Sequence, residues 1–243
     1  MERVDPRAGI ISKRLGSVER IIAVASGKGG VGKSLVSTVL ALTLAEENSV
    51  GLLDLDFYGP SCHTIIGAGE AEPKEEKGVV PPLIKGVKLM SIAFYSRDKP
   101  LPLRGTEVSD AILELLAITI WGKLDYLIVD LPPGMGDAIL DVLRYMKKEE
   151  VLVVTTPSVL SLKSVEKLLE MLVKLKVRVI GVLENMRFEE NRRVEELALK
   201  YRVKYLGSIP FDPAVEGSIG DPDALLKTNF SIKLRENVLR VLH

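Results

Sequence analysis

The sequence has little cysteine and no excess of charge, and both shortages limit what the protein can be. Cys62 is the only cysteine among 243 residues, which excludes a disulfide within one chain and a metal site built from several cysteines of one chain. Basic and acidic side chains number 33 each, so the formal net charge is zero. Nothing in this balance indicates a nucleic-acid partner.

Long apolar runs are also missing. No run reaches the roughly 18 residues that a membrane span needs. No positively charged segment followed by an apolar one opens the chain, as it would in a secretory signal. We therefore expect a cytoplasmic protein.

The sequence does contain a repeated alternation of apolar strands and amphipathic helices. This order predicts an α/β fold, with a mostly parallel sheet and helices on both faces. We expect residues 1–20 to form an N-terminal arm with a short helix near 10–15, and residues 21–243 to form one domain. Strands are predicted at 21–25, 50–55, 87–95, 124–131, 151–155, 177–183 and 204–208, and helices at 34–46, 106–121, 160–173 and 194–201. A charged surface loop is predicted at 70–77 and a second loop at 97–102.

A glycine-rich segment follows the first predicted strand and matches the phosphate-binding pattern G-x-x-x-x-G-K-S. Its glycines let the backbone wrap around a polyphosphate, and the following helix adds the positive end of its dipole. In such a loop the lysine reaches the β- and γ-phosphates, and the serine hydroxyl holds Mg²⁺. We predict that the site is formed by Gly27, Lys28, Gly29, Gly30, Val31, Gly32, Lys33, Ser34 and Leu35.

Aspartates at the ends of two other predicted strands belong beside this loop. Asp54 and Asp56 are two residues apart, so they point to the same side of a strand end. One would orient Mg²⁺ and the other the attacking water, although a helix cap or a solvated turn would also explain either residue. Asp130 ends an apolar strand, which is the Walker B pattern near Mg²⁺. Gly134 follows in a sharp turn and is predicted to sense the γ-phosphate through its N–H.

These segments together resemble the Mrp/Nbp35/ApbC family of P-loop ATPases, which are related to MinD and ParA and carry a deviant Walker A loop. The resemblance covers roughly residues 15–240. Besides the loop, it rests on LDLDFYGPS at 53–61, DLPPGMGD at 130–137, TTP at 155–157, ENM at 184–186 and GSIP at 207–210.

The resemblance implies a dimeric, Mg²⁺-dependent ATPase with slow turnover. Lys28, the extra lysine of the loop, would cross the dimer to the nucleotide of the other subunit, as an arginine finger does. Together with Lys33, Asp56 would act in catalysis by positioning the attacking water. Asp54 would join Ser34 and Asp130 around Mg²⁺.

The same resemblance implies the residues around the adenine base. Asn185 would hydrogen-bond the base, since an amide side chain both donates and accepts. The segment 209–212, with Pro210 and Asp212, would lie against the base.

One feature of this family is absent. Its members hold an Fe–S cluster between two subunits, with a C-x-x-C pair from each that follows Glu-Asn-Met. Residues 187–193 read RFEENRR instead, and thiolates are the ligands that such clusters need. The chain is therefore predicted to act as a homodimer, or as a heterodimer with a cysteine-bearing paralogue, on Fe–S apoproteins. A dimer would also bring two copies of Cys62 and His63 together, although packing beside the nucleotide is the interpretation we favour.

The C-terminal segment 231–243 leaves an alternative open. Leu234, Val238, Val241 and Leu242 share one helical face with basic residues around it. Such a helix either packs on the domain or lies on a membrane surface. The second case would favour a MinD/ParA-like positioning or partner-recruiting ATPase.

Overall fold

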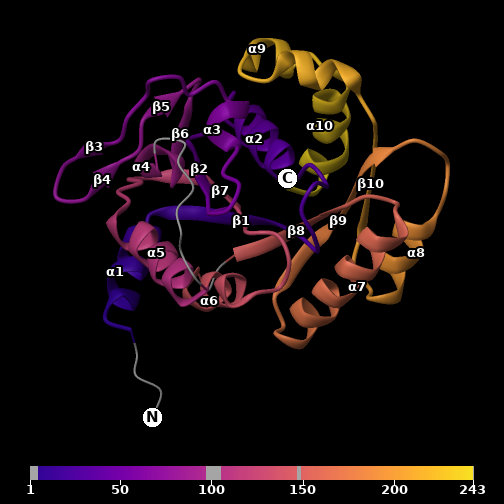
Figure 1. Cartoon of the computed structure of the whole chain (residues 1–243), viewed down its shortest axis with the longest axis horizontal. Coiled ribbons are helices and arrows are strands. Elements are labelled where there is room, and N and C mark those ends of the chain that lie inside the picture. Colours follow the sequence, from indigo (N-terminus) through magenta and orange to yellow (C-terminus); the bar gives the residue numbers. More distant parts are fainter. Residues whose placement is uncertain (1–4, 97–104, 147–148, 243) are drawn as a thin grey trace.

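The computed structural model describes residues 5–96, 105–146 and 149–242 (Figure 1). Within these residues an eight-stranded sheet has the order β10-β9-β8-β1-β7-β2-β6-β5, and all neighbours are parallel except the hairpin of β5 and β6. The strands are β1 (Val18–Ser26), β2 (Val50–Asp54), β5 (Leu83–Ile84), β6 (Val87–Ser91), β7 (Leu124–Asp130), β8 (Glu149–Thr155), β9 (Arg178–Arg187) and β10 (Tyr205–Pro210).

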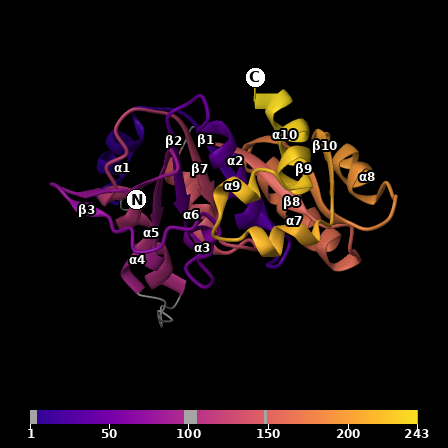
Figure 2. The same ribbon diagram turned by 90° about the horizontal axis from the view of Figure 1, so that it is seen from above.

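Helices cover both faces of this sheet, which confirms the predicted fold class (Figures 1 and 2). One face carries α1 (Arg7–Leu15), α5 (Gly105–Ile118), α6 (Asp137–Met146), α7 (Val159–Lys174) and α8 (Arg193–Lys200). The other carries α2 (Lys33–Leu44), α3 (Cys62–Ile65), α9 (Pro222–Leu225) and α10 (Asn229–Leu242). Short elements complete the chain: β3 (Lys74–Glu75), β4 (Val79–Val80), α4 (Ala93–Ser96) and the 3₁₀ turn η1 (Pro213–Ser218).

The central strands explain why the sheet forms and where it presents polar groups. β1, β2, β7 and β8 are almost continuous runs of buried apolar residues, as strands covered on both faces must be. Parallel pairing sets Asp130 beside Val24 on one side and beside Asp54 on the other. Ser91 pairs with Asp54 in turn. The register therefore brings the polar ends of three strands together at the carboxyl edge of the sheet.

Several predicted elements differ from the observed ones. Strand β1 already begins at Val18, and α1 packs its apolar side on α5 and α6, so part of the predicted arm belongs to the folded core. The strand predicted at 87–95 ends at Ser91 and turns into α4. Helix α6 was not predicted, and the predicted surface loop at 70–77 contains β3, which pairs with β4. The loop predicted at 97–102 lies outside the described residues.

The position of the C-terminal helix α10 contradicts the interpretation that its apolar face lies on a membrane surface. Its apolar side is buried against α2 and β10, with Phe230, Leu234, Val238 and Leu242 at most 5% exposed. Arg240 donates to the carbonyl of Leu206, and so it ties the basic side of the helix to the domain as well. This apolar face is therefore used for packing. In the described part of the chain, no helix is long and apolar enough to cross a membrane.

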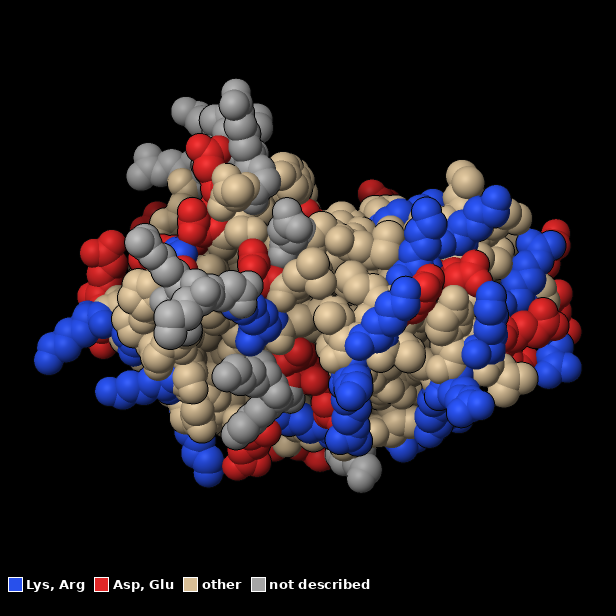
Figure 3. All heavy atoms as spheres, turned by 90° about the horizontal axis from the view of Figure 1, so that it is seen from below, with Lys and Arg blue, Asp and Glu red and all other residues tan. Residues whose placement is uncertain are grey.

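Charged side chains are unevenly spread over the face of α7 and α8. Figure 3 shows lysine and arginine side chains crowded over this half of the molecule, with acidic groups between them. On α7 and α8, Lys174 pairs with Glu170 at 2.7 Å, and Lys200 pairs with Glu166 at 2.5 Å. The zero net charge of the chain therefore conceals a basic face that acidic residues interrupt.

Candidate functional site

The predicted phosphate loop lies at the carboxyl edge of the sheet, between β1 and the first turn of α2. Gly30 and Gly32 have φ values of 78° and 83°, a region that favours glycine. At Gly32 a Cβ would also lie 2.3 Å from the side-chain nitrogen of Asn185. Helix α2 begins at Lys33, so its unpaired N-terminal N–H groups and dipole belong to this loop. The loop therefore has the glycine conformations and the helix N-terminus that its motif predicts.

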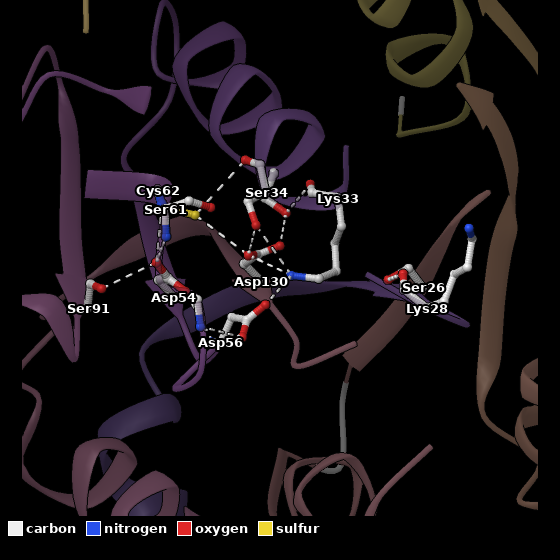
Figure 4. A network of polar contacts seen from close by, with 12 residues as sticks. Ser26, Lys28, Lys33, Ser34, Asp54, Asp56, Ser61, Cys62, Ser91 and Asp130 are labelled. Carbon is white, nitrogen blue, oxygen red and sulfur yellow. Dashed lines mark hydrogen bonds and ion pairs between the residues drawn. The ribbon is translucent and has the colours of Figure 1, made fainter. Parts of the chain in front are cut away.

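Lys33 lies inside the site and pairs with Asp130. Its Nζ is 2.7 Å from the Asp130 carboxylate, and the two side chains are 5% and 0% exposed (Figure 4). Burial by itself lowers the pKa of Lys33, but the charge of Asp130 and the hydrogen bond to it outweigh burial and raise the pKa above its ordinary value. Hydroxyls of Ser34 and Ser37 donate to the two oxygens of Asp130 at 2.6 and 2.7 Å. Lys33 is thus held in place by Asp130, and Asp130 by the two serines.

Asp54 has a structural task that its sequence position did not reveal. Its carboxylate accepts hydrogen bonds from the backbone N–H groups of Asp56, Ser61 and Cys62 and from the Ser91 hydroxyl (Figure 4). The side chain is fully buried. Burial, assisted by the charge of Asp130, raises the pKa of Asp54 to about 7. Asp54 therefore fixes the segment between β2 and α3 as well as lying beside Asp130.

Asp56 and Lys28 lie on different sides of this cluster. One carboxylate oxygen of Asp56 is 3.9 Å from Nζ of Lys33, and the other accepts the N–H of Gly59. Lys28 is partly exposed, and Figure 4 shows its side chain pointing away from Lys33 and Asp130. The structure therefore brings Asp56 to the buried lysine and leaves Lys28 directed away from it.

Gly134 does not present a free N–H to the loop. Its φ of 96° is again a glycine conformation, and its N–H donates to the carbonyl of Ser26 at 2.9 Å. The turn after β7 is therefore bound to the end of β1. Sensing a phosphate through this N–H, as the sequence predicts, requires the bond to Ser26 to break.

A cavity of about 260 Å³ lies beside the loop and collects the residues predicted to surround a base. Asn185 is buried and donates from Nδ2 to the carbonyl of Val31 at 2.9 Å, so the described residues leave its oxygen as the available acceptor. The carboxylate of Asp212 caps η1 and accepts the N–H of Phe230, so it holds the pocket wall. The cavity is lined by Leu35, Ile65, Asn185, Met186, Pro210, Phe211, Asp212, Pro213, Val215, Glu216, Ile219 and Phe230.

The donor set suits Mg²⁺ better than an Fe–S cluster. Ligand atoms of Asp54, Cys62 and Asp130 all lie within 4.8 Å of one another, and the Ser34 hydroxyl adjoins them. Carboxylate and hydroxyl oxygens are the ligands that Mg²⁺ prefers. Burial raises the pKa of the Cys62 thiol well above its ordinary value, and its sulfur lies 3.7 Å from Asp130. A single buried thiol cannot supply the several thiolates that a cluster needs.

Two residues of this site, Ser37 and Ser91, were missed in the sequence. Ser37 belongs to the buried side of α2, one turn after Lys33, where a polar residue in an apolar stretch was the available signal. Ser91 was hidden because the strand was predicted to continue past it. The contact of Cys62 with Asp130 arises because Asp54 fixes the segment that carries Cys62, and no sequence pattern predicts this contact. His63 was left open with Cys62, and it follows that residue in the short helix α3.

The chain is similar to proteins of one group. Residues 17–242 match the ParA family model described as "NUBPL iron-transfer P-loop NTPase". The "Iron-sulfur cluster carrier protein" of Pseudomonas fragi is 40% identical over 240 residues, which span 90% of this chain and 83% of that protein. The protein of the same name from Rickettsia felis is 38% identical over 202 residues, 82% of this chain, but the match spans only 64% of its own length.

A solved structure extends this similarity to the fold. The nucleotide-binding protein of Archaeoglobus fulgidus in complex with ADP superposes with a TM-score of 0.76 at 35% identity. The alignment covers 93% of this chain and 94% of that one. The architecture and the sequence comparisons therefore agree along nearly the whole chain.

Proposed function

The chain belongs to the family of NUBPL iron-transfer P-loop NTPases, and from this premise we propose that it binds Mg²⁺-ATP and hydrolyses it slowly as a dimer. The observation that carries the proposal is the buried cluster of Lys33, Ser34 and Asp130 beneath the glycine loop and beside the base-sized cavity. The glycine loop and Lys33 thereby match the phosphates, Ser34 and Asp130 match Mg²⁺, and the cavity matches the base. We also propose that residues 21–243 act as one ATPase domain, with α1 and residues 18–20 of β1 packed into the same core.

The residues of the cluster divide the work. Lys33 moves its hydrogen bond from Asp130 to the phosphates, and Asp130 and Ser34 then hold Mg²⁺, with Asp54 behind them. Bound Mg²⁺ neutralises charge that develops on the phosphoryl group. Asp56, which adjoins Lys33, accepts a hydrogen bond from the attacking water and orients it. Asn185 accepts from the amino group of adenine through its free oxygen.

Lys28 completes the site of a second subunit in this proposal. It points away from its own cluster, which supports a role across a dimer interface (Figure 4). A Lys28→Ala variant should keep the ATP affinity of the parent and lose turnover by about 100-fold or more, because fingers in trans act on the transition state. Calorimetric binding and steady-state phosphate release measure the two quantities. Unchanged turnover would contradict the crossing lysine, and lost affinity would place Lys28 in the site of its own chain.

The iron–sulfur role is proposed to need a partner. The relatives named above are cluster carriers, but Cys62 is buried beside Asp130 and the segment after Met186 has no cysteine. We propose that the chain drives transfer of a cluster held by a cysteine-bearing subunit to apoprotein clients.

Iron and acid-labile sulfide, measured after anaerobic reconstitution of the whole chain and of Cys62→Ser, test the need for a partner. Neither protein should retain a stoichiometric cluster. A cluster in the parent chain that the variant loses would contradict the proposal.

A further inference from the structure

Two exposed phenylalanines stack on each other at the rim of the base-sized cavity. The ring centroids of Phe188 and Phe211 are 5.0 Å apart with an interplanar angle of 22°. The two residues are 76% and 50% exposed. Offset stacking of this kind is favourable. A pair of large apolar rings directed into solvent is the kind of feature that marks a binding surface.

The positions of the two rings relative to the cavity differ. Phe211 lines the cavity together with Asn185 and Met186, whereas Phe188 is not among the lining residues. Phe188 therefore touches the cavity only through Phe211, whose ring it covers from outside. Any ligand that packs against the ring of Phe211 is supported from behind by Phe188.

The backbone holds this pair in place from both strands. β9 and β10 run parallel with Arg187 opposite Pro210, and the N–H of Phe211 donates to the carbonyl of Arg187 at 3.1 Å. The guanidinium of Arg187 donates to the Ser208 hydroxyl at 2.8 Å and to the carbonyl of Glu189 at 3.1 Å. These bonds fix the start of the segment after β9, on which Phe188 is carried.

The same segment also reaches the phosphate loop. Met186 has a φ of 55°, an uncommon conformation for a residue other than glycine, and its methyl group would lie 3.5 Å from a Cβ on Gly32. Asn185, one residue earlier, bonds to the carbonyl of Val31. The end of β9 therefore contacts the loop on one side and leads into the aromatic pair on the other.

We propose that Phe188 is a positioning residue for the nucleobase: by stacking on Phe211 it holds the outer wall against which a purine ring packs. This inference rests on the proposed nucleotide-binding function and adds to it a residue that need not touch the ligand. Phe211 supplies the contact, and Phe188 fixes the ring. Binding of a nucleobase in the cavity therefore changes the position of Phe188 and of the segment 187–193 that carries it.

The test compares a ligand that has a base with one that lacks it. Mg²⁺-ATP and Mg²⁺-tripolyphosphate are titrated calorimetrically into the whole chain and into Phe188→Ala. Loss of the supporting ring should weaken ATP binding by about three- to tenfold, the range expected for one aromatic pair. Tripolyphosphate affinity should not change. Phe188→Tyr should restore ATP affinity, and Leu199→Ala, which removes an equally exposed side chain on α8, should leave both affinities unaltered.

A second readout follows the segment itself. The indole of Phe188→Trp would replace a ring that is 76% exposed, whereas the native Trp121 is fully buried and precedes β7, at the opposite edge of the sheet from the phosphate loop. The emission of the variant should therefore shift with ATP and not with tripolyphosphate.

Three results would overturn the inference. Equal ATP affinity in Phe188→Ala and the parent would overturn it while leaving nucleotide binding intact. An equal loss of affinity for ATP and for tripolyphosphate would show that Phe188→Ala disturbs the phosphate loop as a whole. Failure of the parent chain to bind ATP at all would refute the proposed function and the inference together.

Discussion

The ion pair of Lys33 and Asp130 gives the sharpest prediction about the nucleotide-free chain. The two side chains are buried and 2.7 Å apart. Removing one partner of a buried pair leaves an uncompensated charge and costs about 3–5 kcal/mol. Ser34 and Ser37 still donate to Asp130 after Lys33→Met, so we expect the lower end of that range, about 3 kcal/mol.

A double-mutant cycle measures this coupling. Asp130→Asn should also cost about 3 kcal/mol, because it removes the nearer carboxylate from a buried ammonium group and leaves only Asp56, at 3.9 Å. The double variant should lose much less free energy of unfolding than the sum of the two single losses, so that the coupling energy is about 2–3 kcal/mol. Urea unfolding at pH 7 without nucleotide, followed by the fluorescence of the buried Trp121, gives the free energies of unfolding.

The matched control is an exposed pair with the same geometry. Lys85 and Asp223 are also 2.7 Å apart but 50% and 69% exposed. The same cycle on this pair should give a coupling below about 1 kcal/mol, since solvent screens it. Additive losses at Lys33 and Asp130, within about 0.5 kcal/mol, would refute the argument that burial makes this pair matter.

Three further predictions concern the fold around the site. Burial raises the pKa of Asp54 from about 3.9 in the unfolded chain to about 7, so the native state holds the extra proton and the free energy of unfolding falls as pH rises from 4 to 7. Urea unfolding of Asp54→Asn across that range should show a shallower fall than the parent, and an equal slope would contradict the raised pKa. In Gly27→Ala the new Cβ would lie 2.5 Å from backbone atoms of α7, so the free energy of unfolding in urea should fall by about 1–3 kcal/mol. Gly29 has open space around it, so the free energy of unfolding of Gly29→Ala should stay that of the parent. In thermal unfolding, Leu234→Ala should lower the free energy of unfolding by about 2–5 kcal/mol, because Leu234 is buried. Ile232→Ala, at an exposed position of the same helix, should lower it by no more than about 0.5 kcal/mol. Equal losses would mean that α10 is not packed as described.

Contiguous motifs could be located in the sequence because their chemistry is local. The glycine loop and Asp130 could be placed because strand, loop and helix must follow one another in a P-loop. Once β2 is known to pair with β7, the parallel register brings Asp54 beside Asp130. The burial pattern of α10 was visible in its spacing, although which surface it covers was not.

Features that depend on long-range packing were not predictable. Lys33 was assigned to phosphates, and its bond to Asp130 depends on how the folded loop packs on the end of β7. Asp54 accepts its hydrogen bonds from a segment that folds back over it. The apolar run after Ser91 suits a strand or a helix equally, because short runs do not reveal their period. Helix α6 did carry a signal, with buried residues at Ile139, Val142, Leu143 and Met146.

The most direct test of the central claim is calorimetric titration of the whole, nucleotide-free chain with ATP, with and without Mg²⁺. A site formed by Lys33, Ser34 and Asp130 predicts saturable binding of one nucleotide per chain, with affinity that falls strongly when Mg²⁺ is removed. No saturable binding at millimolar ATP, or binding that is indifferent to Mg²⁺, would contradict the assignment of this cluster as a nucleotide site.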